Sequence, residues 1–412
     1  MSATIASTAA DRSRMRYIPE LLAIHLEELE FLWGQRRQAL QSTRYFLRDF
    51  LHLNERLEAH IQGLLAVPQA LPDLLWPQLL AAESRDSVFA AACPLLRLAD
   101  AELTAQIVRQ FESGAAAAAP GFRDAFCFAP AGQFVNSLKR VVLDGDGVHA
   151  AYAATALANL RALDGRNEAL AALLLHSEPK VAANAWQAAI VADAQLPQSG
   201  SRPYQQALSR PEAAVRSGAI KAAIWSRQDW LPQILEKMAA SGDAVAVEWL
   251  AVIGGGQHGS LLVSQMERIG DLQTRCELLA RFGHPGGLEI LRRWMAGGDA
   301  LLASHAGAAF TRITGYDVRG ERIEAPVADD SDEFEREFAP LIWTADLGKV
   351  DAYLSQNAGQ LKTASRWSRG MPLDAVSGEQ QLAGLDLQIR WDQLARIRLS
   401  GNAAVFPAPI FD

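Results

Sequence analysis

Three consecutive glycines with a histidine two positions after them occur in the stretch WLAVIGGGQHGS, from Trp249 to Ser260, and raise the question of a phosphate-binding loop. A Walker-type loop requires GxxxxGK[ST], and this stretch lacks the lysine. A dinucleotide fingerprint requires a preceding β-strand, whereas the residues before these glycines follow a helical pattern. A similar succession recurs in LLARFGHPGGLEILRRWM, from Leu278 to Met295. The glycines therefore predict a turn between two helices, and a local anion site at a helix N-terminus is the alternative.

A second stretch, DGDGVH from Asp144 to His149, has the composition of a calcium loop. An EF-hand that starts at Asp144 needs an acidic residue at its twelfth position, and Thr155 stands there. Because a short acidic side chain before a helix accepts hydrogen bonds from the first-turn amides, Asp146 is predicted to be a helix N-cap.

Histidine and cysteine spacing does not indicate a metal or catalytic site. The eight histidines include neither an HExxH motif nor a pair at i, i+4. Cys93, Cys127 and Cys276 are far apart and form no CxxC motif, so they are predicted to be buried, reduced thiols. No nucleophile elbow is present. We therefore expect no catalytic residue, no cofactor and no metal ligand, and we expect that the protein is not an enzyme.

The composition indicates a globular helical protein. Half of the 412 residues are apolar, and the formal net charge is −8, which argues against a nucleic-acid or anionic-membrane binder. Residues 1–16 lack the apolar core of a signal peptide and are predicted to be disordered. No run of about 18 apolar residues is present, so we expect a cytoplasmic protein without membrane insertion.

The central part of the chain, residues 71–318, has a soft internal period. A valine that follows a polar or proline-containing turn recurs at separations of 60, 33, 34 and 30 residues, and the first gap is long enough for two units. These valines are Val88, Val148, Val181, Val215 and Val245. Each precedes an alanine-rich helical segment, and a second helix follows about half a unit later. This spacing is typical of stacked helical repeats. Residues 17–70 have a different amphipathic pattern and are predicted to form a helical N-terminal cap.

The repeated units resemble HEAT repeats, whose helix pairs stack into an α-solenoid. The chain is also similar to an uncharacterised proteobacterial HEAT-repeat family often encoded near type VI secretion components. Four stretches carry this similarity: IPELLAIHLEELEFLWGQR, LRDFLHLNERLEAHIQGLL, AGAAFTRITGYDV and RWSRGMPL. The resemblance implies an all-α, HEAT-like solenoid and a partner such as a secretion spike or effector, and it implies no catalytic residues.

Residues 319–412 are predicted to form a distinct acidic C-terminal region. From Glu321 to Asp412 there are 15 acidic and 9 basic residues, a net charge of −6. The stretch DDSDEFERE, residues 329–337, predicts a solvated loop that leads into a helix, with an electrostatic docking strip as the alternative. The final VFPAPIFD is either a cap on the solenoid or a peptide offered to a partner.

Stacked helix pairs expose a long surface that generally binds other proteins, so the leading hypothesis is a non-catalytic adaptor or scaffold. In KVAANAWQAAI, Lys180, Asn184 and Gln187 follow helical spacing and are expected to point outward into a protein-binding surface. Arg216, Lys221 and Glu248 are weaker candidates on neighbouring helices. The alternative function is a small-ligand or chromophore-handling enzyme that uses the solenoid groove. A DNA glycosylase is disfavoured because acidic residues balance the basic ones in the repeats.

Overall fold

A computed structural model describes residues 18–132, 134–163, 168–192, 202–326, 337–362 and 365–401. The predicted disordered segment 1–16, the acidic stretch 329–336 and the final residues 405–412 lie outside this part. The described chain is predominantly helical, as expected, with four short strands after residue 318 that the all-α prediction does not include. Contacts divide it into two compact units, with the boundary between Ala222 and Ala223. Residues 319–401, where described, belong to the same unit as the helices from residue 231 onward.

The first unit contains helices only, among its described residues. They are α1 (Pro19–Ala39), α2 (Leu47–Leu65), α3 (Leu71–Ala81), α4 (Arg85–Arg97), α5 (Ala101–Ser113), α6 (Ala119–Phe128), α7 (Phe134–Asp144), α8 (Gly147–Asn159), α9 (Glu168–Leu174), α10 (Pro179–Val191), α11 (Arg202–Leu208) and α12 (Ala213–Trp225), whose last turn crosses the boundary.

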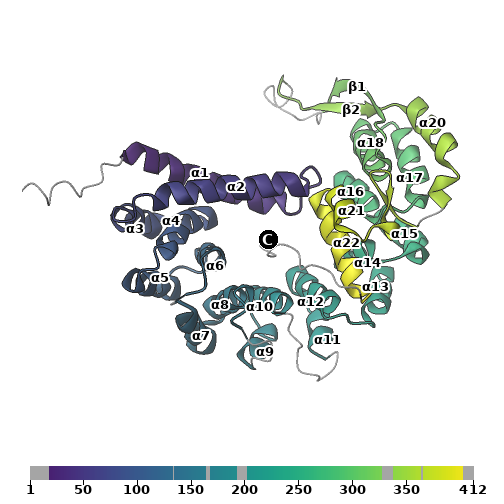
Figure 1. Ribbon diagram of the computed structural model, residues 1–412. Helices are drawn as coiled ribbons and strands as arrows, with labels where there is room; N and C mark the ends of the chain where they lie inside the picture. The colour runs from purple at the N-terminus through teal and green to yellow at the C-terminus, as the bar shows by residue number, and fades with distance from the viewer. Residues whose placement is uncertain are drawn as a thin grey trace, which may run out of the picture. The chain divides into compact units, whose positions relative to one another are not determined.

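Within this unit, α4, α6, α8 and α10 pack side by side in one row, and α3, α5, α7 and α9 lie along the other side of the row (Figure 1). The pair α1 and α2 packs against α4. Close approach of α6 to α4 requires a small residue, since a Cβ at Gly121 would lie 2.5 Å from the carbonyl oxygen of Arg85. We call α4, α6, α8 and α10 the helix row.

The recurrent valines mark the first turns of a related set of helices. Val88, Val181, Val215 and Val245 are buried near the starts of α4, α10, α12 and α14, and Val148 lies half-buried in the first turn of α8. The 60-residue gap between Val88 and Val148 contains α6, which packs between α4 and α8. Asp146 caps α8 by accepting a hydrogen bond from the amide of His149, so the predicted N-cap is confirmed.

The second unit combines helices with two antiparallel strand pairs. Its described elements are α13 (Leu231–Ala240), α14 (Ala244–Ile253), η2 (Gly256–His258), α15 (Gly259–Met266), α16 (Leu272–Phe282), α17 (Gly286–Met295), α18 (Ala300–Thr314), β1 (Arg319–Glu324), β2 (Leu341–Ala345), α20 (Leu347–Asn357), η3 (Gln360–Lys362), β3 (Trp367–Ser368), β4 (Met371–Pro372), η4 (Leu373–Ala375), α21 (Glu379–Ala383) and α22 (Leu387–Leu399). Helix α14 packs on α16 and α22, α16 packs on α18, and α18 contacts β2 and β3.

The three glycines Gly254–Gly256 form an inter-helix turn, as predicted: α14 ends at Ile253, and η2 leads into α15. Neither Gly254 nor Gly255 has the positive φ that glycine permits, because φ is −66° at Gly254 and −96° at Gly255. Position 254 instead lacks room for a larger residue, because a Cβ there would lie 2.9 Å from Nδ1 of His258.

Candidate functional site

A cavity of about 330 Å³ lies along the helix row of the first unit. Five helices supply its wall, and four of them contribute a residue from their first turn. The lining residues are Arg85 of α4, Pro120 and Arg123 of α6, Tyr152 of α8, Pro179, Lys180, Ala183, Asn184 and Gln187 of α10, and Ala214 of α12. We call this cavity the row pocket.

Three of the residues predicted from the sequence meet in the row pocket. Lys180, Asn184 and Gln187 lie on one face of α10, because residues three and four apart on a helix are neighbours. Lys180 is exposed, and its Nζ lies 3.4 Å from the carbonyl oxygen of Ala116. Gln187 does not point outward as expected: it is 7% exposed, since it lies deeper in the row than Lys180. The three residues therefore extend from the rim of the pocket to its buried wall.

The other three predicted residues lie elsewhere. Arg216 donates from Nη1 to the carbonyl oxygens of Arg210 and Pro211, at 2.7 and 2.6 Å, so its guanidinium stabilises the turn before α12. Lys221 is half-buried on α12 and is not among the residues that line the row pocket. Glu248 lies on α14 in the second unit and pairs with Arg281 at 2.8 Å.

The row pocket is bordered by an ionic cluster, and this cluster was not predicted from the sequence. The carboxylate of Asp124 is fully buried and accepts hydrogen bonds from Arg85 Nε at 2.7 Å, Arg123 Nη2 at 2.7 Å and Trp33 Nε1 at 3.1 Å. The guanidinium of Arg123 is itself buried and lies over the ring of Tyr152, 5.3 Å from its centroid. Sequence order places Arg123 and Asp124 side by side, but only the packing of α1, α4 and α6 brings Trp33 and Arg85 to them.

The row pocket is electropositive. Arg85, Arg123 and Lys180 line it, and none of the described lining residues is an aspartate or glutamate. Asp124 supplies one negative charge behind the wall, against the two guanidiniums that it binds. The first turns of α4, α6, α10 and α12 also face the pocket, and each helix N-terminus carries about half a positive charge. The pocket is therefore suited to an anionic group.

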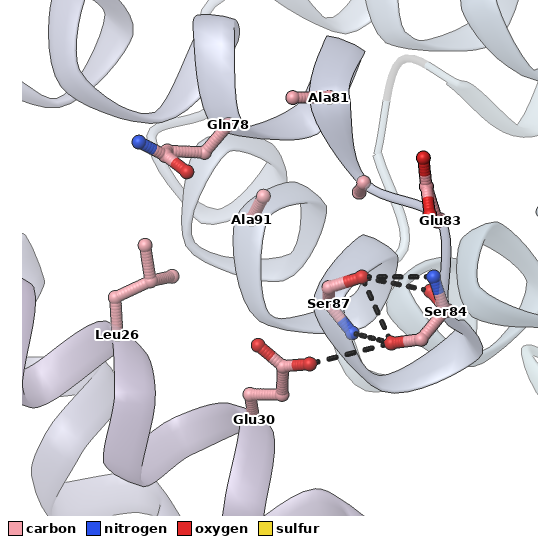
Figure 2. Close-up of a pocket in the computed structure, with 9 residues that line it drawn as sticks. Leu26, Glu30, Gln78, Ala81, Glu83, Ser84, Ser87 and Ala91 are labelled. Atoms are coloured by element: carbon pink, nitrogen blue, oxygen red, sulfur yellow. Dashed lines mark hydrogen bonds between the residues drawn. The ribbon is translucent and has the colours of Figure 1, made fainter.

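A second cavity, of about 310 Å³, lies between α1, α3 and α4 (Figure 2). Glu30, Glu83, Ser84 and Ser87 are its charged and hydroxyl-bearing residues. Both serines are engaged in capping α4, because Ser84 Oγ accepts from the amide of Ser87 and Ser87 Oγ accepts from the amide of Ser84. Ser84 Oγ also donates to Glu30 at 3.3 Å. These contacts give the polar groups a structural role in holding α1 to the start of α4.

Two further groups of titratable residues lie in the helices. His25 of α1 and His60 of α2 place their Nδ1 atoms 3.1 Å apart, a pair that the sequence spacing did not reveal because it joins two helices. The three cysteines are free thiols, with Cys93 and Cys276 buried and Cys127 half-buried. Burial raises the pKa of each thiol to about 12, so they remain protonated at neutral pH.

In the described part of the chain, no group of three or more His, Cys, Asp or Glu side chains is arranged to hold a metal ion. None of the described helices combines the length and apolar character needed to cross a bilayer. Comparisons with known protein families, with curated proteins and with solved structures found no match.

Proposed function

We propose that this protein is a non-catalytic adaptor whose first unit is a HEAT-like α-solenoid that binds a segment of another protein along the helix row. The observation that supports this proposal most directly is the row pocket. Its wall draws on five successive helical layers, so a ligand seated there contacts residues from position 85 to position 214. A pocket of this size can take side chains of an extended polypeptide that continues along the helix row.

The chemistry of the wall supports binding in place of catalysis. Its polar side chains are engaged in structural contacts: Arg85 and Arg123 bind Asp124, and Asn184 Nδ2 donates to the carbonyl oxygen of Lys180 at 2.7 Å. Groups held in this way orient a ligand through hydrogen bonds and charge. The resemblance to a HEAT-repeat family near type VI secretion components extends the proposal to a partner in that apparatus, a spike or an effector, in the cytoplasm.

The proposal is tested by site-specific photocrosslinking in cells that produce the protein and its partners. A benzophenone amino acid at Asn184, on the row pocket, is compared with the same amino acid at Arg140, which is exposed on α7 on the other side of the row. We expect one discrete crosslinked protein at position 184 and none at position 140. Equal crosslinking at both positions, or none at either, contradicts the proposal.

A further inference from the structure

We propose that the row pocket is a carboxylate-binding site that selects an acidic segment of the partner protein, an inference that rests on the proposed function. Arg85, Arg123 and Lys180 contribute three positive charges to the pocket wall, and Asp124 offsets one of them. A buried cluster with excess positive charge is stabilised when an anion from outside completes it.

The helix N-termini add to this field. Helices α6 and α10 each have a proline in the first turn and no side chain that caps their first amides. Pro120 and Pro179 line the pocket, so these uncapped ends face it, together with the first turns of α4 and α12. Backbone amides and the helix dipole at such ends favour a bound anion.

Because the proposed ligand is a segment of a protein, the anionic groups it presents to the pocket are the carboxylates of Asp and Glu. Arg85 and Arg123 both direct their Nε and Nη2 edges at Asp124, which occupies the paired donors that carboxylate and phosphate groups commonly bind. The ligand therefore meets a positive field and the ammonium group of Lys180 at the rim, together with the amide of Asn184 one helical turn further on. Each of these donors can bind one oxygen atom of an Asp or Glu side chain.

The negative charge of the rest of the protein confines the binding of an acidic peptide to the row pocket. The whole chain carries a net charge of −8, so an acidic peptide is repelled by the average surface and gains affinity only where the local field is positive. Non-specific attraction of an acidic peptide to this protein is thereby suppressed. An acidic probe thus reports on the row pocket with little background.

The experiment uses the full-length protein and fluorescein-labelled hexaglutamate, with hexaglutamine as the uncharged control, in fluorescence anisotropy. We expect hexaglutamate to bind, hexaglutamine not to bind, and binding to weaken as salt rises. Lys180→Glu should weaken binding by about tenfold, because one charge-assisted contact is replaced by repulsion. Lys139→Glu, on exposed Lys139 of α7, is the matched control and should change binding less than twofold.

Several outcomes overturn the inference. They are equal binding of hexaglutamate and hexaglutamine, unchanged binding in Lys180→Glu at an unchanged melting temperature, and displacement of the probe by inorganic phosphate at lower concentration than by glutarate. Asn184→Asp is a second variant that should weaken hexaglutamate binding, because it adds a negative charge to the pocket and leaves the residues of the Asp124 cluster unchanged. A crosslinked partner at position 184 without selectivity for hexaglutamate would leave the adaptor proposal standing and refute this one. Selective hexaglutamate binding without a crosslinked partner would support a carboxylate-binding row pocket and refute the adaptor proposal.

Discussion

Two buried arginines, one in each unit, have different kinds of partner: Arg123 binds a carboxylate, whereas Arg366 binds backbone carbonyl oxygens. In the first unit, Arg85 and Arg123 surround the buried carboxylate of Asp124, and the cations come from the same helix or a neighbouring one. In the second unit, the fully buried guanidinium of Arg366 binds no carboxylate at hydrogen-bonding distance among the described contacts. It donates to five carbonyl oxygens, those of Ala251, Val252, Gly254, Arg281 and Phe282, at 2.6 to 3.2 Å.

These five carbonyls lie at the C-terminal ends of α14 and α16, where helices leave their last carbonyl groups without intrahelical partners. Arg366 therefore joins two helix ends that are more than 80 residues away in the sequence. The carbonyl oxygen of Gly254, in the three-glycine turn, is one of these five acceptors. In the same unit, Arg281 of α16 and Arg312 of α18 make ion pairs with Asp392 and Asp386.

The difference indicates how each unit gains its stability. Helices of the first unit pack mainly on sequence neighbours, so removal of one contact affects a local region. The second unit depends on contacts that close long loops of chain, and their loss exposes the ends of several helices at once. Substitutions that remove side chains of equal size are therefore expected to lower the free energy of unfolding more in the second unit than in the first.

The largest effect is expected for Arg366→Ala. Up to five buried carbonyl groups lose a charged donor, so the free energy of unfolding of the second unit should fall by roughly 3 kcal/mol or more. Urea denaturation followed by hydrogen exchange and mass spectrometry measures this change separately in α14, α16 and the helices of the first unit.

The matched control is Arg293→Ala, because Arg293 is 68% exposed and makes one ion pair, with Glu267 at 3.4 Å. Its effect should stay within about 0.5 kcal/mol. If Arg366→Ala costs no more than Arg293→Ala, or if protection is lost in the first unit to the same extent, the comparison between the units is refuted.

A smaller loss of stability is expected for Gly283→Ala. Gly283 ends α16 with a φ of +65°, and the amide of Trp367 donates to its carbonyl oxygen at 2.7 Å. A Cβ at position 283 would clash with the carbonyl oxygen of Trp367. The strained φ and the clash together should cost roughly 1–3 kcal/mol, measured by thermal unfolding. Gly298→Ala is the control, because no atom lies within 4 Å of the Cβ position at Gly298. A similar loss of stability at both positions would show that the close approach of Gly283 to Trp367 has no effect on stability.

Much of the helical pattern was readable from the sequence because local signals determine it. The recurrent valines, the Asp146 cap and the glycine turn all act within a few residues, and the structure confirms each of these positions. One further local signal was available and was missed: Asp243, Asp271 and Asp299 cap α14, α16 and α18 at intervals of 28 residues. Together they would have predicted the helix starts of the second unit.

The contacts that define the candidate site could be read only in part. The helical spacing of Lys180, Asn184 and Gln187 correctly groups them on one face of α10. Their approach to Arg85 and Arg123 depends on how α4, α6 and α10 stack, which no local pattern specifies. The same limit applies to Arg366, the first residue of RWSRGMPL. The motif can be recognised in the sequence, but the role of Arg366 cannot be predicted from it, because the partners of Arg366 are 84 to 115 residues away.

The smallest effect concerns the first unit and the pair His25 and His60. Burial lowers the pKa of His60 below its usual value, and the neighbouring His25 adds to this effect. Arg56 also lowers the pKa, whereas Glu28 raises it. The unfolded chain then binds the proton more readily than the folded one. The stability that neutral His60 provides is therefore complete above about pH 6.5, the ordinary histidine value, and decreases as the pH falls through the lower pKa of the folded state.

This prediction is checked by measuring the free energy of unfolding of the first unit between about pH 7.5 and 5.5, a range in which ordinary carboxylates do not titrate. The wild-type unit should lose stability on acidification, and His60→Gln should lose less. His52→Gln is the control, because His52 is also on α2 but its side chain is 71% exposed. An equally steep decline in His60→Gln and in the wild type would show that the pair does not couple folding to pH. A decline confined to the second unit would reverse the expectation that the histidine pair acts locally, through α1 and α2 alone.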